Sequence, residues 1–269
     1  MSLDSFAHLY EEATIDVARH AILCMLNDHL PPLRPDMHIL DLACGSGSVT
    51  RVIYEQCEAK GLQPPKITGV DVGPNFITAF NENKAARNWH TASAFVCDAS
   101  DLSPLQDNTF DIVIMSFALF ILDTKASASA AEIRRVLKPG GHAAITTWRE
   151  NWVERMFVGA NEAIGYTEVA ERFKMTKWDK METGRNALLA GGFEADKVQH
   201  SRVDFQYTFD TVDDFLDRFS TPFWLGMAAR SWTEEQKPQW RGEIAKLVTE
   251  EEKKKGEVPI GLWLFIVKK

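Results

Sequence analysis

The sequence predicts an α/β fold in which a parallel sheet carries helices on both faces. Short runs rich in Ile and Val alternate with helical runs through roughly the first 150 residues, and this alternation is typical of a parallel sheet. The first apolar run, residues 38–43, ends at a loop that contains Gly45 and Gly47, after which a helical pattern begins. Sheets of this kind bind ligands beyond the carboxyl ends of their strands. We therefore expect a ligand site at this loop.

The elements of the first half follow from length and pattern. Strands are predicted at His38–Ala43, Lys66–Asp71, Ala94–Cys97, Phe110–Met115 and His142–Thr147. Helices are predicted at Val49–Lys60, Pro74–Arg87 and Ala126–Leu137. Pro74 suits a first helical turn, where its missing N–H would have no partner. Asp111 is expected to pair locally, and Pro139-Gly140-Gly141 is expected to form a turn.

The flanks of this region are expected to be mostly helical. Residues 3–30 are predicted as one or two amphipathic helices that end at Pro31-Pro32, whereas residues 151–179 carry aromatic side chains without a strand pattern. Further helices are predicted at Met181–Ala190, Val212–Phe219 and Thr233–Lys255, and strands at Gln199–Thr208 and Gly261–Lys268. No repeat or long linker is visible, so residues 1–269 are expected to form a single domain.

Composition disfavours several classes of partner. The net charge is −8, and the one lysine run, residues 253–255, follows three glutamates, so nucleic acid is not expected as a partner. The longest apolar segment, residues 112–122, is too short to span a bilayer. The four cysteines lack the spacing of metal ligands. We expect a cytoplasmic protein with reduced thiols, no membrane span and no metal.

Five marks in order along the chain resemble class I S-adenosylmethionine-dependent methyltransferases. They are Asp41-Leu-Ala-Cys-Gly45-Ser-Gly47, Gly69-Val-Asp71, Cys97-Asp98-Ala99, residues 110–116 and Arg135-Val-Leu-Lys-Pro139-Gly140-Gly141. The resemblance implies a Rossmann-like seven-stranded sheet, mostly parallel with an antiparallel C-terminal strand, helices on both faces and a helical lid. It also implies an N-terminal helical cap (1–32), a cofactor-binding core (33–150) and lid or substrate-binding insertions at 151–180 and 209–257.

The same resemblance implies that S-adenosylmethionine is the cofactor and S-adenosylhomocysteine the product. The implied cofactor-binding residues are Asp41, Ala43, Gly45, Ser46, Gly47, Asp71, Val72, Asp98, Ala99 and Ser116. A side chain at Gly45 or Gly47 would occupy the space of the methionyl part, and Asp41 would lie near its ammonium group. Asp71 could accept both ribose hydroxyls. Asp98 could accept from the adenine amino group, with the helix N-cap as its alternative role.

The acceptor is less well defined by the sequence. Tyr10, Phe117, Trp148, Trp152 and Trp224 are candidate substrate-binding residues of a partly apolar pocket, with ordinary core packing as the alternative for each aromatic side chain. No His–acid pair identifies a general base. The layout is similar to ubiquinone- and menaquinone-pathway methyltransferases and to fungal secondary-metabolite enzymes, including the gliotoxin-type thiol methyltransferases.

The expected function is methyl transfer to a small, partly apolar molecule, a secondary metabolite methylated on S, O or N. Two alternatives stay open: a cofactor-binding protein that does not methylate, as a partner subunit or rearrangement catalyst, and a quinone-pathway C-methyltransferase. A nicotinamide-binding fold is disfavoured because its fingerprint needs a small residue where this chain has Thr50. Monomer and homodimer are both compatible with the sequence.

Overall fold

The computed structural model describes residues 16–174 and 177–269, whose strands form a seven-stranded sheet in the order β3-β2-β1-β4-β5-β7-β6. The strands are β1 (His38–Leu42), β2 (Lys66–Asp71), β3 (Ala92–Val96), β4 (Phe110–Met115), β5 (Leu137–Glu150), β6 (Val198–Thr208) and β7 (Glu257–Lys268). The first five pair in parallel. The end of β7 runs antiparallel to the start of β5, since Gly140 N donates to Lys269 O at 2.8 Å and Lys269 N to Gly141 O at 3.0 Å. The expected Rossmann-like fold class is confirmed.

The chain divides into two compact units. The first comprises residues 1–147, 180–203 and 263–269, and the second comprises residues 148–179 and 204–262. Three of the boundaries between them fall inside β5, β6 and β7. Each unit is described in turn.

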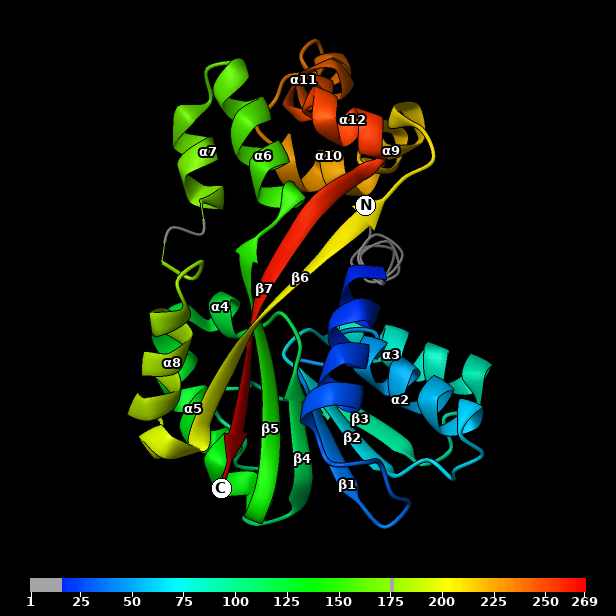
Figure 1. The fold of residues 1–269 in the computed structure, drawn as a ribbon, viewed down its shortest axis with the longest axis vertical. Helices are drawn as coiled ribbons and strands as arrows, with labels where there is room; N and C mark the ends of the chain where they lie inside the picture. Colours follow the sequence, from blue (N-terminus) through cyan, green and yellow to red (C-terminus); the bar gives the residue numbers. More distant parts are fainter. Residues whose placement is uncertain (1–15, 175–176) are drawn as a thin grey trace. The chain divides into compact units, whose positions relative to one another are not determined.

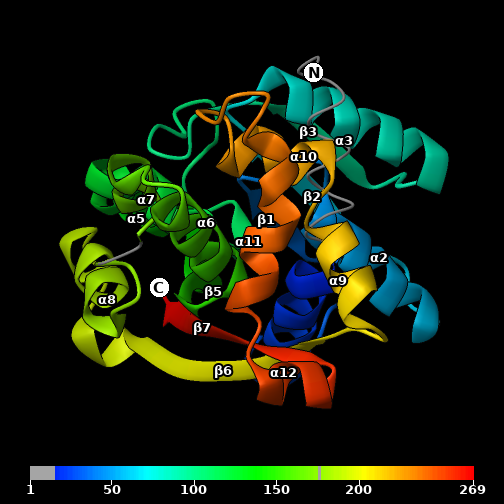
Figure 2. The same ribbon diagram turned by 90° about the horizontal axis from the view of Figure 1, so that it is seen from above.

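The first unit places helices on both faces of its strands (Figures 1 and 2). Its helices are a segment over residues 16–24 that continues into a π-helical turn (Met25–His29), α2 (Ser48–Ala59), α3 (Pro74–Arg87), α4 (Leu119–Leu122), α5 (Ala126–Val136) and α8 (Met181–Ala190). Short 3-10 turns lie at Asp123–Lys125 and Ala195–Lys197. Helices α2 and α3 lie on one side and α5 and α8 on the other. The central strands are fully buried, as in Ile39, Leu40 and residues 112–114, because helices cover a parallel sheet on both sides.

The expected turn at Pro139–Gly141 is instead part of β5. Phe110 pairs with Leu137 but Ile112 already pairs with His142, so the intervening residues bulge out of the ladder. Gly140 adopts the left-handed region with φ 81°. The reciprocal backbone hydrogen bonds with Lys269 keep this segment paired, and a local sequence pattern cannot reveal a partner so distant in the chain.

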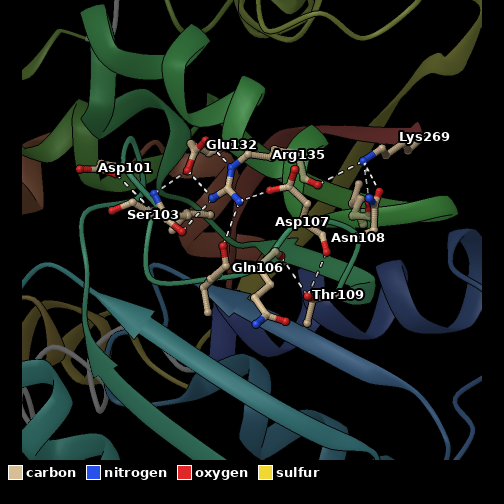
Figure 3. Close-up of polar contacts among 12 residues, drawn as sticks. Asp101, Ser103, Gln106, Asp107, Asn108, Thr109, Glu132, Arg135 and Lys269 are labelled. Carbon is tan, nitrogen blue, oxygen red and sulfur yellow. Dashed lines mark hydrogen bonds and ion pairs between the residues drawn. The ribbon is translucent and has the colours of Figure 1, made fainter.

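Arg135, the first residue of the last motif mark, anchors the loop before β4 (Figure 3). Its guanidinium donates to Leu102 O at 2.8 Å and Leu105 O at 2.9 Å, and it pairs with Glu132 and Asp107. These acidic partners raise the pKa of Arg135, against partial burial. This mark of the sequence therefore has a structural role. Asp111 is expected to pair locally, but its carboxylate accepts from Lys138 Nζ at 2.8 Å and from His38 N at 2.8 Å, which lie 27 and 73 positions away in the sequence.

The second unit is helical around an aromatic core. It contains α6 (Trp152–Ala163), α7 (Thr167–Phe173), α9 (Val212–Arg218), α10 (Pro222–Ala228), a 3-10 turn (Lys237–Gln239), α11 (Trp240–Leu247) and α12 (Glu250–Lys255). Figure 2 shows α11 between α6 and α9. The amide of Asn161, fully buried, donates to Phe157 O and Ala228 O and accepts from Trp232 Nε1 at 2.9 Å. The side-chain amide of Asn161 is therefore hydrogen-bonded at both its nitrogen and its oxygen.

The helix expected over Thr233–Lys255 is divided into separate elements. Thr249 has extended backbone angles (φ −70°, ψ 158°), and its side chain accepts from Glu252 N, while Glu252 accepts from Thr249 N. This reciprocal capping box starts α12 afresh. In the described parts of the chain, no helix combines the length and apolarity needed to cross a membrane.

Candidate cofactor site

The glycine-containing loop lies at the carboxyl ends of β1 and β2, as the sequence predicts. Asp41 on β1 is in register with Gly69 on β2. The loop then leaves the sheet with three residues in the left-handed region: Ala43 (φ 57°), Gly45 (φ 54°) and Gly47 (φ 101°). Its start is fixed by Cys44 N, which donates to Val70 O at 2.9 Å, and Ser46 O accepts from Asn83 Nδ2 at 3.0 Å. The backbone of the loop is therefore hydrogen-bonded to β2 on one side and to α3 on the other.

Asp41 is buried beneath this loop, with 1% of its surface exposed. Its Oδ2 accepts from Thr50 N at 3.1 Å and from Thr50 Oγ1 at 2.7 Å. Burial raises the pKa of Asp41 to about 7; the hydrogen bonds from Thr50 lower it, and the charge of Asp71 raises it. Nearby, burial raises the pKa of the Cys44 thiol well above its ordinary value. A negative charge at Asp41 is therefore costly unless a cation lies close to it.

Asp71 holds the loop from the second strand. Its Oδ2 accepts from Gly45 N at 2.9 Å, and its Oδ1 accepts from Gly73 N at 2.9 Å. Each carboxylate oxygen has two lone pairs, so both retain capacity for a further donor such as a ribose hydroxyl. The carboxylate is thereby oriented by the backbone on both sides.

The two glycines of the loop differ in what surrounds them. A Cβ built on Gly45 would meet only Phe76 Cδ1, at 3.9 Å, whereas one on Gly47 would lie 2.7 Å from Trp89 Cζ3 and 3.0 Å from Phe80 Cδ2. At Gly45 a Cβ would therefore make one ordinary contact and meet no crowding. Gly47 is needed for the close approach of Phe80 on α3 and of Trp89. Its contact with the cofactor stays a prediction.

The residues expected around an adenosine group surround the ends of β2 and β3. Val72 follows Asp71 and is 68% exposed, which is unusual for a large apolar side chain. Asp98 accepts from Ser100 N and Oγ and pairs with Lys125 Nζ at 2.9 Å, and these contacts lower the pKa of Asp98 to about 2. Ala99 is buried. Asp98 therefore already orders its own turn, and an adenine contact would use its remaining lone pairs.

The end of β4 carries a strained turn. Phe117, a candidate substrate-binding residue, has φ 55° and donates its N–H to Thr146 Oγ1 at 3.0 Å. Positive φ is costly for a bulky residue and is typical of functional turns. Next to it, Ser116 Oγ is buried and has no hydrogen-bond partner among the described residues. An unsatisfied buried hydroxyl is compatible with a ligand contact at this position.

Together these features fit S-adenosylmethionine. The uncrowded backbone at Gly45, the carboxylates of Asp41 and Asp71 that bond to Thr50 and Gly45, and an exposed apolar side chain at Val72 match a cationic methionyl group, a ribose and an adenine ring.

Comparison with known proteins agrees with this geometry. A family model described as a methyltransferase domain matches residues 40–145, which include the loop, β2, β3, β4 and parts of β1 and β5. Over these residues the chain is similar to methyltransferase domains. It is 26% identical over 209 residues to methyltransferase tpcH of Aspergillus fumigatus, which covers 75% of this chain and 71% of that protein.

Two further similarities concern part of the sequence and the fold. The chain is 30% identical over 120 residues to the ubiquinone/menaquinone biosynthesis C-methyltransferase UbiE of Burkholderia vietnamiensis, covering 45% of this chain and only 46% of that relative. The structure of the cyclase SpnF superposes with a TM-score of 0.56 at 18% identity, covering 94% of this chain and 80% of that chain. At this identity the similarity concerns the fold alone.

Three of the other candidate substrate-binding residues belong to the second unit. Trp152 is 2% exposed and packs on Phe215, with ring centroids 4.9 Å apart, and Arg155 lies over its ring at 4.5 Å. Trp224 is 4% exposed and packs on Phe219 and Phe223. Both belong to the aromatic core of that unit, whereas Trp148 is half-buried. Tyr10 lies outside the described residues.

One polar residue at the loop, Thr50, is not among the residues that the motif indicates. Thr50 is fully buried and supplies both donors to Asp41, yet its position in the motif served only to disfavour a nicotinamide site. Its place three residues into the helix after the glycines is the signal that could have found it. In residues 16–174 and 177–269, no group of three or more His, Cys, Asp and Glu side chains is arranged to hold a metal ion.

Proposed function

We propose that this protein transfers a methyl group from S-adenosylmethionine to a small, partly apolar acceptor, a secondary metabolite with a nucleophilic S, O or N atom. The observation that carries the proposal is a loop with an uncrowded backbone at Gly45, held by two ordered carboxylates: Asp71 accepts from Gly45 N and Asp41 accepts from Thr50 N. The similarity of this chain to a methyltransferase of Aspergillus fumigatus over three quarters of its length supports the same class of reaction.

Each residue of the site would serve the bound donor in a definite way. Gly45 would let the methionyl part approach the backbone, and Asp41 would balance its positive charge. Asp71 would accept from the ribose hydroxyls, while Val72 would cover one face of the adenine ring. Ser116 Oγ would find a hydrogen-bond partner at the end of β4, beside the strained turn at Phe117.

The donor supplies an electrophilic methyl group on a sulfonium, and the protein supplies alignment. Methyl transfer neutralises this cation, so orientation of the acceptor and exclusion of water can provide much of the rate enhancement. None of the residues placed at the site is assigned as a general base. An acceptor that ionises near neutral pH, such as a thiol, depends little on a general base for removal of its proton.

A different observation favours each alternative. Similarity to UbiE over residues of the methyltransferase domain favours a carbon acceptor of the quinone type. The fold shared with the cyclase SpnF favours a catalyst that keeps the fold without methylating. In that case the bound sulfonium would serve as a fixed charge.

Release of S-adenosylhomocysteine tests these alternatives together. The purified protein is incubated with S-adenosylmethionine and, separately, with pooled thiols, phenols, amines and prenylated hydroquinones. Product from the thiol, phenol or amine pool supports the proposal, and product from the hydroquinones alone supports carbon methylation. Donor binding by calorimetry without product from any pool favours the non-methylating alternative. Absence of binding at millimolar donor overturns the proposed function itself.

A further inference from the structure

We propose that Thr50 is a positioning residue for the donor: it holds one oxygen of Asp41 so that the other oxygen is presented to the cationic methionyl end. This inference rests on the proposed function, because it concerns how the same site treats its donor. It assigns a role to a residue outside the glycine motif, on the helix that follows.

The start of α2 explains why Asp41 needs such a partner. The first N–H groups of a helix have no partner within it, and a side chain at the N-cap position usually accepts from one of them. Here the N-cap is Gly47, which has no side chain and makes no side-chain cap. A larger residue is excluded there because its Cβ would lie 2.7 Å from Trp89. Asp41, from β1, accepts from Thr50 N instead and acts as the cap.

The hydroxyl of Thr50 adds a second bond to the same oxygen. Thr50 Oγ1 donates to Asp41 Oδ2 at 2.7 Å, shorter than the backbone bond of 3.1 Å. Among the described residues, the two hydrogen bonds that the Asp41 carboxylate accepts from Thr50 both fall on Oδ2. With one oxygen occupied by α2, the orientation of the carboxylate is fixed, and Oδ1 is the atom left for a ligand.

The same contact controls the charge of the carboxylate. Burial favours the neutral form of Asp41, and so does the neighbouring Asp71 carboxylate from β2, whereas both donors of Thr50 favour the charged form. On the loop itself, the buried Cys44 stays a thiol because its pKa is raised. The hydroxyl of Thr50 is thus the contact that a single substitution can remove while the backbone cap remains.

The test is the pH dependence of S-adenosylhomocysteine affinity, measured by calorimetry between pH 5.5 and 8.5. This probe carries the methionyl ammonium group and does not turn over. For the unaltered protein, affinity should fall as the pH drops through about 7. Thr50→Val should move that midpoint upward by about one pH unit, since a hydrogen bond to a charged group is lost. The loss of affinity should then be about fivefold at pH 7 and under twofold at pH 8.5.

Three matched variants complete the experiment. Thr50→Ser keeps the hydroxyl and should restore the original profile, and Asp41→Asn should bind weakly with no midpoint near pH 7. Thr68→Val removes another buried hydroxyl of the same unit, which bonds His38 Nε2 at 2.9 Å, and should leave the profile unchanged. If Thr50→Val does not fold, Thr50→Ala replaces it.

The outcomes separate the two proposals. An equal loss of affinity by the Thr50 variant at every pH indicates a packing defect and overturns the positioning role, as does an unchanged midpoint. A pH profile that persists in Asp41→Asn overturns it as well, because the titrating group would then be another residue. If the unaltered protein binds no S-adenosylhomocysteine at any pH, the proposed function fails instead.

Discussion

Substitution by alanine should affect mainly stability at Gly47 and mainly cofactor binding at Gly45. Gly47→Ala places a methyl group 2.7 Å from Trp89 Cζ3 and 3.0 Å from Phe80 Cδ2, at a φ of 101°. A left-handed backbone costs an L-residue roughly 1–2 kcal/mol, and overpacking of a core adds about 1–3 kcal/mol. We expect the free energy of unfolding to fall by about 2–5 kcal/mol, a large part of the stability of an ordinary domain.

Gly45→Ala carries the strain without the crowding. Its nearest neighbour would be Phe76 Cδ1 at 3.9 Å, an ordinary contact, so the loss of stability should be only about 1–2 kcal/mol. The new methyl group would instead occupy the space proposed for the donor. Affinity for S-adenosylhomocysteine should fall at least about tenfold, which corresponds to about 1.4 kcal/mol.

Urea unfolding followed by tryptophan fluorescence, together with calorimetry of S-adenosylhomocysteine binding, measures both effects. A loss of about 3 kcal/mol would lower the urea midpoint by roughly 1–3 M. If Gly47→Ala proves as stable as Gly45→Ala, the packing argument is wrong. If Gly45→Ala binds S-adenosylhomocysteine as tightly as the unaltered protein does, the donor does not lie beside Gly45.

Four other perturbations have defined outcomes. Asp71→Asn should weaken S-adenosylhomocysteine binding by about 1–3 kcal/mol, and unchanged affinity would contradict its ribose role. Burial lowers the pKa of His38 to about 4 from an ordinary 6.5. Between these two pH values the unfolded chain binds more protons than the folded protein. The free energy of unfolding therefore falls as the pH falls, by at most about 1.4 kcal/mol per pH unit. In urea unfolding, His38→Gln should flatten this decline of the free energy of unfolding between pH 7 and 5. An unaltered dependence on pH would contradict the role of His38. Arg135→Lys should lower stability by about 2 kcal/mol, because lysine cannot bridge the same set of acceptors, while product affinity stays as it was. Any methyl transfer detected should persist in EDTA; loss of activity that magnesium restores would refute a metal-free site.

Much of the sheet could be predicted because each strand carries its own signal. The predicted bounds of β2, β4, α3 and α8 match the structure, since apolar runs and the N-terminal proline of α3 are local features. The predicted and observed bounds of β5 differ, because a segment distant in the sequence determines where this strand begins. Strand β5 begins at Leu137 and includes Pro139–Gly141 because the end of the chain pairs with it.

At the site, residue types could be predicted but the direction of their side chains could not. The motif does not distinguish Gly45 from Gly47, and only the packing of Trp89, far along the chain, does so. The cap of α2 is also non-local, because Asp41 supplies it from the preceding strand. By contrast, the capping box at Thr249 is a local signal of the T-x-x-E type that the sequence contains.

The aromatic residues show the same limit. Trp152 and Trp224 could be expected to contact either a substrate or a core, and the structure buries both among Phe215, Phe219 and Phe223. Their substrate-binding role stays a prediction. Composition identifies side chains that must be covered, but it does not identify what covers them.

The course of the chain between its two units constrains how such a protein can be altered. Neither unit is continuous in sequence: the second is made of residues 148–179 and 204–262, and the first resumes at residues 180 and 263. A shortened gene that ends after residue 147 would lack α8 and the last strand, so neither unit could be expressed alone by trimming one end. To exchange the second unit with that of a relative, recombination would have to replace both residues 148–179 and residues 204–262. All four ends of these two segments would have to be joined in the correct reading frame. Variation in the second unit should therefore accumulate by point substitution more readily than by transfer of whole modules.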